Sequence, residues 1–321
     1  MTKQRAIVVG SGVVGLSSAV RLLEAGFQVE VWTRDLPQRT TSSIAAAIWY
    51  AFKASPAELV VRWARSTYDE FEKLARDPYS GVTMHRGVEL VAVGCVDAGV
   101  QLRAGAKHLQ ALPRAEVPRE FAAGYAMEVP VAEMPIYLDW LVKRLEHLGG
   151  HLHERRVVDF AEPLSQCALV VNCTGLASRE LCHDKEVVAI RGQIVRVEKS
   201  GIDTFVLDDY DPRGLTYVIP RSKDCVLGGT VGIDREDLVP EESSTKDILA
   251  RCISVEPRLK HARVLSVAVG IRPGRSSVRV EAERRGTATL IHNYGHGGAG
   301  ITLSWGCAQD VAALALAATA H

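Results

Sequence analysis

Three glycines near the N-terminus constrain the fold of this chain more than any other feature of its sequence. Gly10, Gly12 and Gly15 follow a short apolar run and precede residues 13–25, whose apolar side chains recur at helical spacing. In a strand–turn–helix unit, the first glycine permits the tight turn, the second lets the backbone approach a pyrophosphate, and the third lets helix and strand pack closely. This pattern predicts a dinucleotide at the helix N-terminus, where free N–H groups and the helix dipole attract phosphate.

The rest of the chain interleaves two kinds of pattern. Strand patterns at residues 29–33, 168–173 and 289–294 extend the N-terminal unit, whereas residues 82–93 and 186–229 alternate as in antiparallel sheets. A chain of 321 residues predicts about two domains. We therefore predict an α/β protein in which a Rossmann-like dinucleotide-binding domain contains an inserted, mostly antiparallel α+β substrate domain. The predicted boundaries are 1–50, 145–185 and 265–321 for the first domain, and 51–144 and 186–264 for the second.

The composition excludes several other classes of protein. Lys plus Arg and Asp plus Glu are both 38, so nothing in the charge indicates binding to nucleic acid or to an anionic membrane. The longest apolar run, residues 311–320, is half of a membrane span. Seven cysteines without a C-x-x-C pair argue against a disulfide framework or a four-cysteine zinc site. We predict no metal site, because His292 and His296 have no acidic or cysteine partners nearby in the sequence.

A second glycine cluster lies between the last strand pattern and the final helix pattern. It reads His292-Asn-Tyr-Gly-His-Gly-Gly-Ala-Gly300. The positive end of the following helix suits the anionic edge of a reduced flavin. A nicotinamide dehydrogenase stays open as an alternative, because Arg34 precedes Asp35 where an acid that binds the adenosine ribose is expected, and arginine suits the extra phosphate of NADP.

Taken together, these segments resemble the D-amino-acid oxidases, a flavoprotein group that also contains the D-aspartate oxidases. The resemblance covers nearly the whole chain. Its carriers are Val8-Val-Gly-Ser-Gly-Val-Val-Gly-Leu16, Arg34-Asp-Leu-Pro37, Thr40-Thr-Ser-Ser43, Ala45-Ala-Ala-Ile-Trp49, Val170-Val-Asn-Cys-Thr-Gly175, Arg191-Gly-Gln193, Thr216-Tyr-Val-Ile-Pro-Arg221, Gly228-Gly-Thr230, Gly270-Ile-Arg-Pro273 and His292-Asn-Tyr-Gly-His-Gly-Gly298. The last block and the Gly270-Ile-Arg-Pro273 segment are the most specific.

The resemblance implies an activity and a cofactor. A D-amino acid would be oxidised to the imino acid by hydride transfer from its α-carbon to N5 of non-covalently bound FAD, and water would release a 2-oxo acid and ammonia. Oxygen would then reoxidise the flavin, giving hydrogen peroxide. The group also implies a homodimer. The chain ends in Ala-Thr-Ala-His321 and lacks the Ser-Lys-Leu type of peroxisomal signal, which favours a cytoplasmic enzyme.

The resemblance also implies roles for particular residues. Arg272 and Tyr217 would bind the substrate carboxylate, the Gly298 carbonyl would receive the amine, and Tyr210 is the weakest candidate for a further active-site tyrosine. The residues expected to bind FAD are Gly10, Ser11, Gly12, Val13, Val14, Gly15, Arg34, Asp35, Thr40, Thr41, Ser42, Ala46, Ala47, Ile48, Val157, Thr174, Gly175, Gly295, Gly297, Gly298, Gly300, Ile301 and Thr302.

Two departures from the group bear on the substrate. The segment 211–216, which precedes Tyr217, is shorter than the active-site lid of mammalian members. D-aspartate oxidases carry an arginine after the Gly-Gly-Thr segment, and here that position is Val231. We therefore predict a neutral D-amino acid as substrate. D-aspartate remains the alternative if Arg213 or Arg221 replaces the missing arginine.

Overall fold

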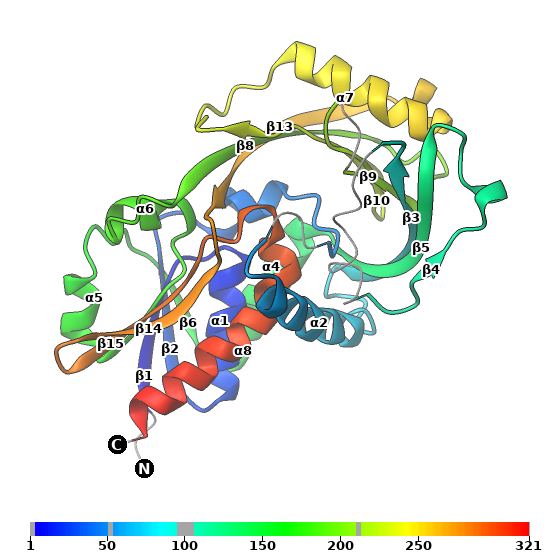
Figure 1. The fold of residues 1–321 in the computed structure, drawn as a ribbon. Helices are drawn as coiled ribbons and strands as arrows, with labels where there is room; N and C mark the ends of the chain where they lie inside the picture. The colour runs from blue at the N-terminus through cyan, green and yellow to red at the C-terminus, as the bar shows by residue number, and fades with distance from the viewer. Residues whose placement is uncertain (1–3, 51–53, 95–105, 210–212, 321) are drawn as a thin grey trace.

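The computed structural model describes residues 4–50, 54–94, 106–209 and 213–320, which form two β-sheets with helices packed against them (Figure 1). The six-stranded sheet has the order β14-β15-β7-β1-β2-β6. Its neighbours are parallel except for β14 and β15, which are antiparallel. Its strands are β1 (Arg5–Val9), β2 (Gln28–Thr33), β6 (His151–Glu154), β7 (Leu169–Asn172), β14 (Arg279–Arg285) and β15 (Ala288–Tyr294). The Rossmann-like part of the predicted fold is thus confirmed.

The central strand of this sheet is apolar throughout because both of its faces are buried. Ala6 and Val8 of β1 belong to the same core as the helices on one face, whereas Ile7 and Val9 pack with residues such as Phe160 on the other. Parallel sheets covered on both sides require such continuous apolar runs. The helices on the first face are α1 (Val13–Glu24), α4 (Met134–His147) and α8 (Gly300–Thr319), with α2 (Ala57–Leu74) packed on α8, and α5 (Ala161–Gln166) covers the second face.

The second sheet has nine strands within the described residues and the order β12-β8-β11-β10-β9-β3-β5-β4, with β13 paired to β8. All of its pairs are antiparallel except β3 with β9. Its strands are β3 (Val82–Ala92), β4 (Gln110–Ala111), β5 (Phe121–Ala132), β8 (Val188–Glu198), β9 (Phe205–Asp208), β10 (Thr216–Pro220), β11 (Asp224–Gly228), β12 (Gly232–Ile233) and β13 (Val264–Gly274).

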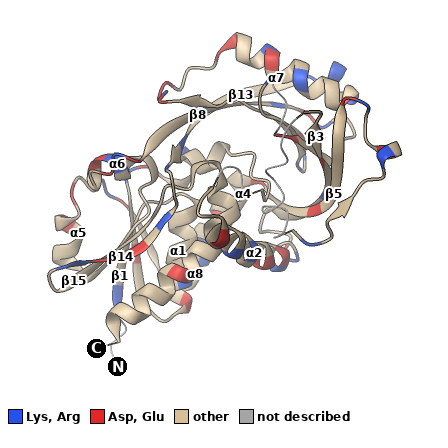
Figure 2. Cartoon of the chain, viewed as in Figure 1, with Lys and Arg blue, Asp and Glu red and all other residues tan. Residues whose placement is uncertain are grey.

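Helix α7 (Glu242–Val255) covers the outer face of the second sheet. Ile248 and Cys252 pack on this sheet, while charges of both signs are interspersed along the rest of the helix (Figure 2). The remaining short helix is α6 (Ser178–Leu181), and the 3-10 turns are η1 (Pro37–Arg39), η2 (Thr41–Ile44), η3 (Arg114–Glu116), η4 (Gly175–Ala177), η5 (Pro257–His261) and η6 (Gly297–Ala299).

The structure differs from the sequence analysis at two strands. Strand β5 was not predicted, because its alanines, Gly124 and Pro130 have low strand propensity, yet it pairs with β3 along its whole length. The predicted boundary at residue 265 assigned β13 to the dinucleotide-binding domain, whereas β13 pairs with β8 of the second sheet. An apolar strand pattern does not reveal which sheet the strand joins. The rest of the predicted domain division stays a prediction.

Helix α8 is long and apolar. With the preceding turn, it spans Gly297–Thr319 and could cross a membrane by length and composition alone, but 61% of its most apolar window is buried inside the protein. It packs against α1 and α2, and Gly306 lies directly on the backbone of Trp63. Its apolar composition is therefore that of a core helix between other elements.

Candidate active site

A cavity of about 970 Å³ is lined by residues from both sheets. This volume lies at the upper end of the range for small-molecule and cofactor sites. The predicted substrate-binding residues Arg272, Tyr217 and Gly298 line it. The predicted cofactor residues that line it are Gly10, Ser11, Gly12, Val13, Val14, Arg34, Asp35, Thr40, Thr41, Ser42, Ala46, Ala47, Ile48, Val157, Thr174, Gly175, Gly297, Gly298, Gly300 and Ile301. Gly15, Gly295 and Thr302 do not line it, and Tyr210 lies outside the described residues.

The N-terminal glycine turn is built as its spacing predicts. Gly10 has φ +112°, and a Cβ there would collide with the Cys173 carbonyl. A Cβ at Gly15 would collide with the Gly10 carbonyl, so this glycine serves helix packing and lies behind the cavity. Helix α1 begins at Val13, its N-cap residue Gly12 has no side chain to cap it, and the Ser42 hydroxyl accepts a hydrogen bond from the Val13 N–H at 3.1 Å. Gly12, Val13 and Val14 line the cavity, so the N-terminus of α1 faces it.

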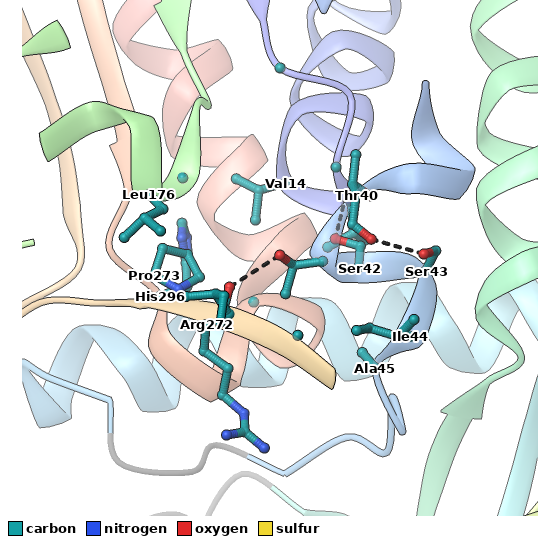
Figure 3. Close-up of a pocket in the computed structure, with 18 of the residues that line it drawn as sticks. Val14, Thr40, Ser42, Ser43, Ile44, Ala45, Leu176, Arg272, Pro273 and His296 are labelled. Carbon is teal, nitrogen blue, oxygen red and sulfur yellow. Dashed lines mark hydrogen bonds between the residues drawn. The ribbon is translucent and has the colours of Figure 1, made fainter. Parts of the chain in front are cut away.

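The loop after β2 forms one wall of the cavity. In Figure 3, Thr40 and residues 42–45 lie on one side, while Leu176, Pro273 and His296 lie on the other. The Thr41 hydroxyl donates to the Ile271 carbonyl at 3.1 Å and so ties the loop to β13. This contact holds a wall of the cavity against the strand that carries Arg272.

Arg34 and Asp35 lie where β2 ends. The Arg34 guanidinium forms an ion pair with Asp35 at 2.7 Å, and the Ser11 hydroxyl donates to the Asp35 carbonyl at 2.8 Å. A carboxylate this close to the guanidinium repels an additional phosphate group. The arrangement therefore favours a ribose hydroxyl over the ribose phosphate of NADP.

Arg272 extends into the cavity from β13 (Figure 3). Its guanidinium lies over Gly192, where any Cβ would collide with it, and its Nη1 donates to the Thr230 carbonyl at 3.1 Å. Among the residues that the structure describes, no carboxylate forms an ion pair with it. A half-buried guanidinium without an acidic partner is suited to a bidentate carboxylate ligand.

Tyr217 lies on β10 beside Arg272. Its ring rests on Gly228, where a side chain would collide with it. Burial raises the pKa of Tyr217 to about 12, and the neighbouring Arg272 guanidinium acts in the opposite direction. The phenol is therefore protonated at neutral pH and can donate a hydrogen bond to an anion held by Arg272.

The C-terminal glycine turn contributes two buried polar atoms. Gly295 and Gly297 have φ +84° and +55°. Between them lies the buried His296, whose Nε2 has no hydrogen-bond partner in the described part of the chain. The Oδ1 atom of the buried Asn293 also has no hydrogen-bond partner there. Both residues line the cavity, and α8 begins there without a side-chain cap. Two helix N-termini whose own N-cap residues offer no side-chain cap, together with two orphan polar atoms, fit a large cofactor with phosphates and ring heteroatoms, as FAD has.

Thr302 contacts Tyr50, a cavity residue that the sequence analysis missed. The Thr302 hydroxyl accepts from the Tyr50 N–H at 3.0 Å and donates to the Tyr50 carbonyl at 2.9 Å. The Tyr50 hydroxyl donates to the buried Glu89 at 2.8 Å. A lone tyrosine after an alanine-rich segment gives no sequence signal for this arrangement. Asp209, which also lines the cavity, was missed for the same reason.

The two arginines that could have bound a second carboxylate are engaged elsewhere. Arg213 donates to Ser254 of α7 at 3.3 Å. Arg221 is buried and forms two hydrogen bonds of 2.7 Å with Asp224. Neither of them lines the cavity, and neither does Val231. Among the described residues, Arg272 is thus the cation that lines the cavity next to Tyr217.

The fold and the cavity define a dinucleotide-binding oxidoreductase with a second, antiparallel sheet over its cofactor site. Residues 5–314 match the family model described as FAD dependent oxidoreductase. The chain therefore belongs to the FAD-dependent oxidoreductase family, and FAD is its cofactor.

Named relatives are similar over almost the full length. The chain is 47% identical to the D-amino-acid oxidase of Rubrobacter xylanophilus, covering 98% of this chain and 96% of the relative. It is 41% identical to that of Streptomyces coelicolor, covering 96% of each chain. It is 32% identical to the D-aspartate oxidase of Homo sapiens, covering 98% of this chain and 95% of the relative. The glycine oxidase of Geobacillus kaustophilus, 19% identical, shares the fold with a TM-score of 0.79 over 97% of this chain and 95% of that one.

Proposed function

We propose that this protein is a D-amino-acid oxidase that converts neutral D-amino acids to 2-oxo acids, ammonia and hydrogen peroxide. The observation that carries the proposal is the Arg272 guanidinium, which faces the cavity beside Tyr217 with no acidic partner among the described residues. The similarity to D-amino-acid oxidases over nearly the full chain supports it.

The residues of the cavity bind and orient the substrate in this proposal. Arg272 and the Tyr217 hydroxyl hold the carboxylate, and the Gly298 carbonyl accepts from the amine. Bound FAD would supply the redox chemistry of the reaction, and the residues of the two glycine turns would hold it. Because the flavin does the chemistry, the protein needs orientation more than a strong general base.

A neutral side chain is favoured over that of D-aspartate. A second carboxylate would need a cation, yet Arg213 and Arg221 are bound to other groups and Val231 is apolar. D-aspartate oxidase activity remains the second candidate because the human relative carries that name.

The test is a visible spectrum of the purified protein without oxygen, recorded after adding D-alanine and, in a separate sample, D-aspartate. We expect oxidised-flavin bands that bleach rapidly with D-alanine and at least tenfold more slowly with D-aspartate. If the flavin bands bleach mainly with D-aspartate, the protein is a D-aspartate oxidase instead. A protein that binds NADP but no FAD would overturn the proposal.

Three properties stay predictions, each with its own measurement. Non-covalent FAD should be released by acid precipitation and appear in the supernatant. A homodimer should give twice the chain mass of 34.9 kDa in sedimentation. A cytoplasmic location should place the activity in the soluble fraction of the source cells.

A further inference from the structure

The segment Arg191-Gly-Gln193 of β8 carries polar side chains that the proposed function leaves unexplained. Gly192 lies under the Arg272 guanidinium on the face of β8 that lines the cavity. Successive side chains of a strand point to opposite faces, so Arg191 and Gln193 point away from the cavity. Both are buried, with exposed fractions of 2% and 0%. Buried polar side chains need partners, and these two bind residues 234–241, the segment between β12 and α7, which we call the strap.

Arg191 and Gln193 hold the strap mainly by its backbone. Arg191 Nε donates to the Asp237 carbonyl at 3.1 Å and to Asp237 Oδ1 at 3.0 Å, and its Nη2 donates to the Val239 carbonyl. Gln193 Nε2 donates to the Glu241 carbonyl at 2.9 Å, and its Oε1 accepts from the Glu241 N–H at 2.8 Å. Moving the strap away from β8 would leave a buried guanidinium and a buried amide without these partners, which is costly. The strap is therefore fixed to the nine-stranded sheet.

Two residues of the strap reach the mouth of the cavity. Glu236 and Leu238 line the cavity, whereas Asp237 and Val239 bind Arg191. This alternation is that of an extended segment. The side chain of Glu236 is 49% exposed and Leu238 is 61% exposed. Residues that line a cavity and are also exposed lie where it opens to solvent.

An ion pair connects the strap to helix α6. Arg179 of α6 also lines the cavity and is partly exposed, and its Nη2 lies 2.7 Å from Glu236 Oε1. Helix α6 follows β7 of the six-stranded sheet, whereas the strap is fixed to β8 of the other sheet. The ion pair therefore joins elements of the two sheets at the mouth of the cavity.

We infer that the strap closes the mouth of the cofactor cavity and that the ion pair of Arg179 with Glu236 latches it to α6, which slows the loss of FAD. FAD that leaves by this mouth must part the strap from α6 and so break the ion pair. A contact that breaks before a ligand leaves lowers the dissociation rate most directly. The inference goes beyond the proposed function and does not depend on the substrate, because FAD dissociation is measured without one.

The experiment measures the rate of FAD dissociation from the purified holoenzyme by flavin fluorescence after dilution. The proteins compared are the wild type, Arg179→Glu, Glu236→Arg and the double variant that carries both substitutions. Each single substitution replaces the ion pair by two like charges, so we expect FAD to dissociate about three- to tenfold faster. The double variant has an ion pair with exchanged charges, and its rate should return to within about twofold of the wild type. Both side chains are partly exposed, so the unfolding free energy of the apoprotein should stay the same.

Arg263→Glu is the matched control. Arg263 also forms an ion pair between distant segments, with Glu198 at 2.7 Å, but neither residue lines the cavity, so FAD dissociation should be unchanged. Unchanged rates in both Arg179→Glu and Glu236→Arg would overturn the inference, and so would a double variant as fast as the single ones. Slower dissociation in Glu236→Arg would overturn it as well, because the added arginine would then bind the FAD phosphates instead of opening the strap.

Discussion

At the scale of single residues, a half-buried guanidinium such as that of Arg272 is stabilised by a bound anion. Arg272→Lys keeps the positive charge but loses the bidentate hydrogen bonding by which a guanidinium binds a carboxylate. We expect kcat/KM for D-alanine to fall about 10- to 100-fold, which corresponds to the loss of one charged hydrogen bond. Steady-state kinetics would show this, with FAD content unchanged.

Arg263→Lys is the control for this substitution. Arg263 is an exposed arginine that forms an ion pair with Glu198 at 2.7 Å, and it does not line the cavity. Its replacement should leave kcat/KM within a factor of two. Equal losses in the two variants would show that Arg272 acts through stability rather than through the substrate.

His296 makes stability depend on pH at the same scale. Burial lowers the pKa of His296 from 6.5 to about 4. Between these values the unfolded chain binds a proton that the folded chain does not, so stability is fully present above pH 6.5 and is lost as the pH falls towards 4. The expected loss is roughly 3 kcal/mol. His292, whose pKa burial also lowers, contributes in the same direction.

Urea unfolding at intervals between pH 4 and 7 measures this effect. In His296→Gln the fall in unfolding free energy between pH 6.5 and 4 should be clearly smaller than in the wild type. The pH dependence of the unfolding free energy that remains in His296→Gln is then due to His292 and other titratable groups. Parallel profiles for the two proteins would contradict the assignment.

At the scale of elements, helix α1 can pack closely against the turn before it because Gly15 has no side chain. Gly15→Ala places a Cβ against the Gly10 carbonyl and must push α1 away from the turn. We expect a loss of about 1–3 kcal/mol in unfolding free energy, as for other overpacked sites. FAD affinity should fall more than tenfold because the helix N-terminus moves from its position.

A flavin-fluorescence titration of the apoprotein measures the affinity, and Gly286→Asn serves as the control. Gly286 also lies in a turn, with φ +63° and open space around its Cβ position, and asparagine tolerates this conformation. Its FAD affinity should equal that of the wild type. Wild-type affinity in Gly15→Ala would mean that the turn adapts to the added methyl group.

At the scale of the whole molecule, one cavity is lined by residues from both sheets, so a bound cofactor should couple their stabilities. FAD at 100 times its dissociation constant adds about 2.7 kcal/mol to the folded state. We expect a single calorimetric transition that shifts upward by about 5 °C with FAD and does not shift with NADP. Two transitions, only one of which responds to FAD, would contradict this coupling.

The sequence by itself determined the parts of the protein that depend on neighbours in the chain. The spacing of Gly10, Gly12 and Gly15 is a local requirement of one turn, so it could be read directly and was confirmed in the fold. Arg272 and Tyr217 were identified by resemblance to a family. The structure places both in one cavity, and their roles toward the substrate stay predictions.

Only the tertiary structure decided which distant segments meet. It joined β13 to β8, and it paired Tyr50 with Glu89, 39 positions apart in the sequence. In the structure, Arg213 and Arg221 form hydrogen bonds with residues outside the cavity, and no sequence spacing indicated these partners. The physical reason is that strand pairing and side-chain hydrogen bonds between distant segments depend on how whole elements pack, and a local pattern carries no information about that packing.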